Sequence, residues 1–221
     1  PSNKDHVIYV WLDALTNYIS ALNYPNTGDN LYKSYWPASL HLIGKDILRF
    51  HAIYWPAFLL AADIQPPKRV YGHGWILSGE EKMSKSKGNI LDPIKIIETY
   101  GLDPLRYYLI KEVSFGNDGN ISQEKLENCI NSDLANNYGN LCQRVISFIE
   151  KNLELKIPEK YVLKDDDKKI LNVYEKSFSK LVDSIDKQNI NFYVNFIQEQ
   201  LFAANKYFND QEPWKKKEDL I

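Results

Sequence analysis

The hydrophobic pattern of the chain changes near residue 120, and this change constrains the fold more than any other feature. Before it, short apolar runs alternate with helical stretches; after it, apolar residues recur at helical spacing over long segments. Alternating strands and helices are typical of a parallel α/β sheet, whereas successive amphipathic helices pack as a bundle. We therefore expect an α/β domain over residues 1–120 and an all-α domain over residues 121–221.

The first part is predicted to alternate between buried strands and helices. The strands are expected at 7–10, 40–43 and 69–77, and the helices at 12–22 and 46–62. Asp46 is a candidate N-cap, and Pro56 predicts a kink or break because proline removes a backbone donor from a helix. Residues 23–38 contain prolines and a glycine, so we expect a loop there.

The remaining elements are predicted from turn signals and helical periodicity. Residues 78–91 are polar and lysine-rich, which indicates a loop, and 116–120 form a turn cluster. Asp-Pro pairs, a cap followed by proline at the first helical position, predict the starts of two short helices. Helices are expected at 93–100, 103–114, 122–152 with an interruption near Gly139, 163–185 and 192–208.

Charge and cysteine usage exclude several classes of protein. The net charge of -2 means that the chain cannot bind polyanions through its overall charge, so any contact with nucleic acid must use a local patch. Cys129 and Cys142 form neither a metal knuckle nor a disulfide framework, which agrees with a reduced compartment. No apolar run is long enough to cross a bilayer, and no signal peptide is visible. We expect a cytoplasmic protein with no membrane partner and no metal site in these residues.

A lysine-rich segment after the last predicted strand carries the strongest chemical signal. Its sequence is Lys82-Met83-Ser84-Lys85-Ser86. Ammonium groups can neutralise phosphates, while backbone and hydroxyl donors fill the remaining lone pairs. A mobile loop of this kind can close over a leaving group as negative charge develops on it. The alternative is a solvated lysine-rich surface loop, which the composition alone would favour.

The same five residues resemble the KMSKS signature of class I aminoacyl-tRNA synthetases, and they follow a predicted sheet as in that family. The resemblance implies that Lys82 and Lys85 are catalytic residues that contact the ATP phosphates and stabilise the departing pyrophosphate. Ser84 and Ser86 would complete the phosphate-binding segment. Met83 has no obvious phosphate role, so we expect it to anchor the loop by packing.

Residues of the first two predicted helices resemble the methionyl-tRNA synthetase family. The matching segments are Trp11-Leu12-Asp13-Ala14 with Tyr18, and Gly44 to Ile47 continuing through Phe50-His51 to Trp55. A pocket for a thioether needs apolar and aromatic walls, because sulfur–aromatic contacts are favourable. The resemblance implies a methionine site made of Trp11, Ala14, Tyr18, Ile47, Phe50, His51 and Trp55. The alternative for each aromatic residue is ordinary core packing.

One residue beside this predicted site departs from the family pattern. Leu15 stands where some members carry proline after the Asp-Ala pair. The departure puts the shape of the pocket in doubt, but not the type of reaction.

The ends of two predicted strands supply candidate ATP ligands. Gly44, Lys45 and Asp46 lie where a strand meets a helix, which is where α/β sheets bind nucleotides. Lys45 could neutralise phosphate and Asp46 could accept from ribose hydroxyls, although a simple N-cap is the alternative for Asp46. By resemblance, the segment His73-Gly74-Trp75-Ile76 would read adenine through backbone groups.

The helical part carries a candidate anticodon site. Asn140 and Arg144 are i,i+4 neighbours, and an amide beside a guanidinium suits an unstacked base. Trp214 follows Pro213 and offers a stacking surface. These four residues resemble the positions with which methionyl-tRNA synthetases read the CAU anticodon of tRNA(Met). The alternatives are a surface Asn–Arg pair and a tryptophan used only for helix packing.

The resemblance covers essentially the whole chain. It implies a methionine–tRNA ligase that uses ATP with Mg²⁺ to form methionyl-adenylate and then transfers methionine to the 3′ end of tRNA(Met). Its fold would be the second half of a Rossmann-type class I catalytic domain, with a stem-contact region before residue 120, followed by an anticodon-binding helical domain.

The other class I signature, HIGH, is missing. Residues 41–44 begin like it, but they lie in a predicted strand too near the lysine-rich loop. We therefore expect the HIGH helix, the first half of the nucleotide fold and any zinc site to precede Pro1. That missing half would be an obligatory partner, and residues 1–221 alone should be inactive. The alternatives are another class I synthetase, such as a cysteinyl enzyme, and a noncatalytic tRNA-binding module.

Overall fold

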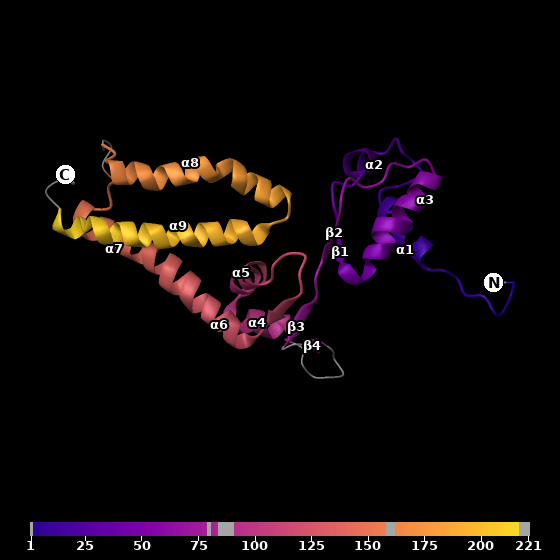
Figure 1. The fold of residues 1–221 in the computed structure, drawn as a ribbon, viewed down its shortest axis with the longest axis horizontal. Helices are drawn as coiled ribbons and strands as arrows, with labels where there is room; N and C mark the ends of the chain where they lie inside the picture. Colours follow the sequence, from indigo (N-terminus) through magenta and orange to yellow (C-terminus); the bar gives the residue numbers. More distant parts are fainter. Residues whose placement is uncertain (1, 79–80, 84–90, 158–161, 217–221) are drawn as a thin grey trace. The chain divides into compact units, whose positions relative to one another are not determined.

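The computed structural model describes residues 2–78, 81–83, 91–157 and 162–216 (Figure 1). Its contacts divide the chain into two compact units, Pro1–Trp75 and Ile76–Ile221. The boundary predicted near residue 120 falls inside the second unit and so does not coincide with this division. As a boundary between two functions, it stays a prediction.

The first unit packs helices around a two-stranded parallel sheet. Its elements are α1 (Trp11–Ser20), α2 (Asn30–Tyr35), β1 (His41–Gly44), a 3-10 turn (Lys45–Ile47), a π-helix (Phe50–Tyr54), α3 (Trp55–Ala61) and β2 (Val70–His73). Strand β1 pairs with β2 so that Gly44 lies opposite His73. The carboxyl ends of both strands therefore meet at the same edge.

The core of the first unit lies between α1 and α3. Its buried residues are Leu15, Ile19, Trp36, Trp55, Leu59 and Ile64. Leu15 is 1% exposed, and burying such a side chain contributes about 1.5–3 kcal/mol. The Trp36 indole satisfies its polar atom by donating to the Gln65 carbonyl at 3.0 Å. Leu15, the departure from the family pattern, is thus a core residue.

Three predictions for the first unit need correction. Residues 7–10 form no strand, and Val7 is 92% exposed. A strand requires a neighbour to pair with, and in the described part of this unit the two strands of the sheet pair only with each other. The loop predicted at 23–38 contains α2, whose N-cap Asp29 accepts from the Leu31 amide. The cap before the third helical run is Gly44 rather than Asp46, which lies inside the 3-10 turn.

The irregularity predicted around Pro56 is confirmed. The π-helix ends at Tyr54, and Pro56 stands in the first turn of α3. Proline is tolerated there because the first amides of a helix have no intrahelical partner. The π-helix before Pro56 carries Phe50 and His51, whose contacts are described below.

The second unit begins with a three-stranded sheet. Strand β3 (Ile76–Ser78) pairs antiparallel with β4 (Glu81–Lys82) and parallel with β5 (Gly119–Ile121). The strand predicted over 69–77 is therefore wrong as a single element, because it divides between β2 and β3 in different sheets. The turn cluster predicted at 116–120 is also corrected at its end, because β5 begins at Gly119. A Cβ on this glycine would lie 2.5 Å from Val113, so only glycine fits.

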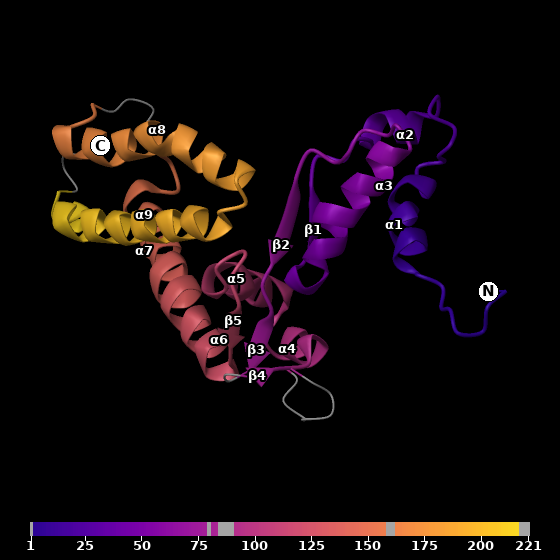
Figure 2. The same ribbon diagram turned by 45° about the vertical axis from the view of Figure 1, so that its right-hand side comes forward.

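Helices make up the rest of the second unit. They are α4 (Pro93–Tyr100), α5 (Leu102–Glu112), α6 (Gln123–Cys129), a π-helix (Ile130–Gly139), α7 (Asn140–Leu153), α8 (Asp165–Asp186) and α9 (Ile190–Gln211), followed by a 3-10 turn (Pro213–Lys215). Helices α8 and α9 lie side by side as a hairpin (Figures 1 and 2). The helices predicted here are confirmed, and so is the interruption near Gly139, where the π-helix ends. The predicted start of α5 is wrong, because the helix begins at Leu102 after Gly101, and Asp103 lies inside its first turn instead of capping it.

A buried polar cluster joins α5 to the π-helix of the second unit. Asp133 is 6% exposed. It accepts from the Tyr107 hydroxyl at 2.8 Å and forms an ion pair with Lys111 at 2.5 Å. Further along the same π-helix, Asn137 donates to the Gln198 side chain on α9 at 2.9 Å. These bonds fix three elements together, because each buried polar group depends on its partner.

Candidate functional site

The structure brings most of the predicted methionine-site residues together. The Trp11 ring stacks on Phe50 with centroids 3.8 Å apart and planes 8° apart. Tyr18 of α1 lies 5.6 Å from the His51 ring and 6.3 Å from the Trp55 ring, again between centroids. The aromatic side chains of helix α1 thus face the π-helix and the start of α3.

A hydrogen-bonded chain runs through the centre of this group. The Tyr18 hydroxyl lies 2.9 Å from Nε2 of His51, and Nδ1 of His51 lies 3.0 Å from the Ile47 carbonyl oxygen. A carbonyl can only accept, so Nδ1 carries the proton and donates to Ile47. Nε2 of the singly protonated ring must then accept from the Tyr18 hydroxyl. This arrangement fixes both the tautomer and the orientation of a histidine that is 2% exposed.

The predicted members of the site differ in their exposure. Trp55 is only 2% exposed, so it also belongs to the core, as the packing alternative proposed. Tyr18 is 38% exposed, although its hydroxyl is directed inward to His51. Ala14 is exposed one turn before Tyr18 on the same face of α1. Ile47 takes part through its carbonyl group.

Sequence reasoning missed His41 in this group. Its ring lies 4.4 Å from that of Tyr18 and 6.3 Å from that of His51. Burial, and secondarily the proximity of His51, lowers the pKa of His41 below its usual range. The sequence predicts the apolar strand that carries His41, but no local pattern indicates that this strand lies beside Tyr18 and His51.

The predicted ATP ligands of the first unit gather at one edge of its sheet. Gly44 and His73 are opposite each other in the β1–β2 pair, and the Lys45 ammonium lies 4.5 Å from the centroid of the Trp75 ring. A Cβ on Gly44 would lie 2.6 Å from a carboxylate oxygen of Asp46. Glycine at this position therefore leaves room for the carboxylate.

The remaining ATP-site predictions fall in the second unit. Ile76 is the first residue of β3 and pairs with Gly119. Lys82 is described only through its backbone, which lies in β4 opposite Leu77 of β3. Ser84, Lys85 and Ser86 lie outside the described residues, so their roles stay predictions. Met83 packs against the buried cluster around Tyr108, as expected for a packing residue, and its role in anchoring the loop stays a prediction.

Two of the predicted anticodon residues, Arg144 and Trp214, share Phe208 of α9 as a neighbour. The Arg144 guanidinium lies over the Phe208 ring at 4.9 Å and donates to the Asn209 side chain. The Trp214 ring lies 5.9 Å from Phe208, and 41% of Trp214 is exposed.

Asn140 and Pro213 flank this group. Asn140 is exposed one turn before Arg144, and Pro213 opens the short 3-10 turn that carries Trp214. Phe208 and Asn209 were missed by sequence reasoning, because nothing local connects them with a residue on α7.

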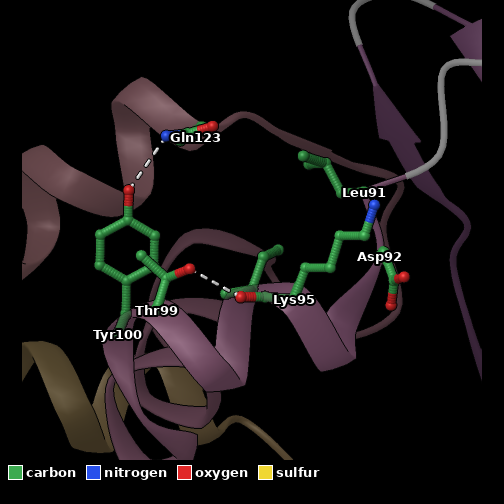
Figure 3. Close-up of a pocket in the computed structure, with 7 residues that line it drawn as sticks. Leu91, Asp92, Lys95, Thr99, Tyr100 and Gln123 are labelled. Carbon is green, nitrogen blue, oxygen red and sulfur yellow. Dashed lines mark hydrogen bonds between the residues drawn. The ribbon is translucent and has the colours of Figure 1, made fainter.

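A pocket of about 270 Å³ lies beside α4 (Figure 3). It is lined by Leu91, Asp92, Lys95, Ile96, Thr99, Tyr100 and Gln123. The Gln123 amide donates to the Tyr100 hydroxyl at 3.0 Å, and the Lys95 side chain extends toward Leu91 and Asp92 (Figure 3). Among the described residues, none of those predicted for a site lines this pocket.

The described residues contain no group of three or more His, Cys, Asp or Glu side chains that could hold a metal ion. Within the same part of the chain, no helix has both the length and the apolar character needed to cross a membrane.

Comparison with known proteins identifies the family. A family model described as "tRNA synthetases class I (M)" matches residues 1–146. The chain belongs to this family. The class I resemblance inferred from the lysine-rich loop is thereby confirmed.

Two curated relatives of this class I synthetase chain are named methionine–tRNA ligase. The methionine–tRNA ligases of Brucella suis biovar 1 (strain 1330) and Mycobacterium leprae (strain TN) are 50% and 46% identical to it over 214 residues. The alignments cover 97% of this chain but only 41% and 40% of those two proteins. The chain therefore spans about two fifths of the length of these relatives.

Solved structures agree with this class I assignment. The Mycobacterium tuberculosis methionyl-tRNA synthetase in complex with methionyl-adenylate has a TM-score of 0.90 and 46% sequence identity, over 98% of this chain and 43% of that one. Its free form has a TM-score of 0.86 with 42% identity, over 98% and 42% of the two chains. The similarity to methionyl-tRNA synthetases is confirmed, together with a fold of small parallel sheets and a helical part.

Proposed function

We propose that the chain is part of a methionine–tRNA ligase, in which it supplies the methionine pocket, part of the ATP site and the anticodon-binding helices. The observation that carries the proposal is the aromatic group around His51. Trp11 stacks on Phe50 at 3.8 Å, and Tyr18 donates to His51 at 2.9 Å. Flat apolar rings suit the thioether side chain of methionine, and one fixed polar pair beside them suits its charged amino group.

The reaction would join the methionine carboxylate to the α-phosphate of ATP, releasing pyrophosphate, and then pass methionine to the 3′ end of tRNA(Met). Lys45, at the edge of the β1–β2 sheet, and the lysines of the loop at 82–86 would stabilise the negative charge of the phosphates. Mg²⁺ would arrive with ATP. The described residues offer no cluster of metal ligands, so we assign no protein ligand to it and no step through it.

The domain assignment belongs to the same proposal. Residues 1–120 would form the second half of a Rossmann-type catalytic domain, and residues 121–221 the anticodon-binding domain. Support for the second assignment comes from Arg144, which is held over Phe208 at 4.9 Å close to a partly exposed Trp214. A guanidinium and an indole arranged in this way can hold an unpaired base by hydrogen bonding and stacking.

Charging of tRNA tests the function. The full-length protein that contains this chain should attach methionine to a transcript with a CAU anticodon and should charge a transcript with an altered anticodon far less. Residues 1–221 alone are expected to form no methionyl-adenylate. Binding of the CAU transcript without charging, by the full-length protein, would favour a noncatalytic tRNA-binding module instead.

A further inference from the structure

His41 lies beside the proposed methionine site, where it lines a pocket of about 260 Å³ together with Tyr18. It is the first residue of β1 and is 6% exposed. Its ring packs against the same Tyr18 whose hydroxyl reaches His51, with centroids 4.4 Å apart and planes tilted by 36°. Trp36 closes the group, 6.0 Å from the His41 ring. The imidazole is thus enclosed by aromatic rings.

Tyr18 depends on such a neighbour for its position. More than a third of its surface is exposed, at 38%, so burial alone does not hold the ring. Its other aromatic neighbours are more distant, with centroids 5.6 Å away for His51 and 6.3 Å for Trp55. A tyrosine ring without its closest support would populate other rotamers, and its hydroxyl would leave Nε2 of His51 for part of the time.

The Nδ1 atom of His41 does not explain the place of this residue in the fold. It is buried and has no hydrogen-bond partner among the described residues. Burial, with a smaller effect from His51, also lowers the pKa of the imidazole and so favours its uncharged form. The rings that neighbour it are those of Tyr18, Trp36 and His51, none of which bears an acidic charge. The closest of these ring contacts is the one with Tyr18.

We propose that His41 is a positioning residue for methionine binding, whose ring holds Tyr18 where its hydroxyl donates to His51. The inference rests on the proposed methionine site and assigns His41 no contact with methionine itself. It predicts that the shape of the ring matters and its nitrogen atoms do not. Because His41 acts through one hydroxyl, its effect should disappear when that hydroxyl is absent.

The test uses the full-length protein and steady-state kinetics of methionine-dependent ATP–pyrophosphate exchange. His41→Ala should raise the KM for methionine roughly 3- to 10-fold, the loss expected for one aromatic pair, and leave the KM for ATP unchanged. His41→Phe keeps the ring and should retain the wild-type KM for methionine. In a Tyr18→Phe background, His41→Ala should raise this KM no further. His41→Leu carries the same expectations should the alanine variant not fold.

Tyr32→Ala is the matched control, because it removes a ring from the same core cluster at a distance from Tyr18. Tyr32 pairs with Tyr24 at 6.0 Å instead, and its loss should leave the KM for methionine unchanged. An equal increase in this variant would show a general effect of core packing and overturn the inference. So would a His41→Phe variant as impaired as His41→Ala, or an undiminished effect of His41→Ala in the Tyr18→Phe background.

Failure of the inference can be told apart from failure of the proposed function. If Tyr18→Phe alone leaves the KM for methionine unchanged, the methionine site itself is misplaced, and the role of His41 falls with it. If Tyr18→Phe raises that KM but His41→Ala does not, the methionine site stands and only the positioning role of His41 is overturned.

Discussion

The Tyr18 hydroxyl donates a hydrogen bond to Nε2 of His51 over 2.9 Å, across two helical elements distant in the sequence. The bond is possible because the protonated Nδ1 of His51 donates to the Ile47 carbonyl oxygen at 3.0 Å, which leaves Nε2 free to accept. The backbone of the turn before the π-helix thereby sets the tautomer of the histidine. Because both protons of the pair are engaged in these two bonds, the group that it can offer to a ligand is an acceptor, the Tyr18 hydroxyl oxygen, held in a fixed position.

Replacement of His51 by alanine tests whether this pair serves methionine. In the full-length protein, His51→Ala should raise the KM for methionine roughly 10- to 100-fold, as expected for a polar contact of about 1.5–3 kcal/mol. The KM for ATP should change little. Equal increases for both substrates, together with a lower melting temperature, would instead identify His51 as a packing residue.

The lysines of the KMSKS-like segment should act on the transition state. Lys82→Ala or Lys85→Ala should slow adenylate formation by about 100-fold, because one lost donor to developing charge costs about 3 kcal/mol. The dissociation constant for methionine should stay near the wild-type value, since the contact is made mainly in the transition state. Pre-steady-state rates and equilibrium binding separate the two quantities. Unchanged activation rates in both variants would make these lysines surface residues.

Arg144 and Trp214 should affect tRNA charging and not amino-acid activation. Arg144→Ala or Trp214→Ala should lower aminoacylation of a CAU transcript roughly 10- to 100-fold, since stacking or a bidentate base contact is worth about 1–3 kcal/mol. Asn209→Ala should have a smaller effect in the same direction, because Arg144 then loses one partner but keeps Phe208.

Lys151→Ala removes an exposed positive charge from the same helix α7 and serves as the control for the anticodon variants. Its charging rate should stay near wild type. Methionine-dependent exchange should survive in all of these variants. Loss of exchange in Arg144→Ala or Trp214→Ala would mean that the substituted residue maintains the fold.

The buried carboxylate of Asp133 should make the stability of the protein depend on acid pH. Burial raises the pKa of Asp133, but hydrogen bonds from Lys111, Tyr107 and Ser132 outweigh this effect and leave the pKa below its usual range. A lowered pKa means that the folded state favours the carboxylate. Its contribution is therefore complete above the unfolded pKa of about 3.9 and is lost as the pH falls through the folded value.

Asp133→Asn should remove this contribution and leave Lys111 without its buried partner. The loss at neutral pH should be about 3–5 kcal/mol in the free energy of unfolding, and the difference from wild type should shrink below about pH 4. Asp183→Asn is the control, because Asp183 pairs with Lys187 on the exposed face of α8 and such pairs contribute about 0.3–0.5 kcal/mol. Denaturant titrations over a pH series measure both. Equal losses in the two variants would contradict the role given to Asp133.

Much of the fold could be predicted from local patterns. Helices α4 and α7 to α9 show regular apolar spacing, and Asp92 caps α4 immediately before Pro93, as expected from the sequence. The strand expected at 7–10 failed because pairing depends on a neighbour and not on apolar content. Gly119 looked like a turn residue, yet it serves the close packing of β5 against Val113.

The residues of the candidate sites could likewise be predicted only in part. Tyr18 and His51 were found because their helices carry a recognisable pattern, and the structure supplies the bond between them. His41, Phe208 and Asn209 were not found, because their contacts join residues far apart in the chain. Single positions of this kind leave no periodic or spacing signal in a sequence.

The most direct measurement of the central claim is ATP–pyrophosphate exchange by the full-length protein across a panel of amino acids. If the aromatic group around His51 is a methionine pocket, methionine should support exchange and cysteine, leucine and valine should support far less. His51→Ala should lower exchange at limiting methionine and recover it at high methionine. Exchange supported best by another amino acid, or by none, would contradict the account.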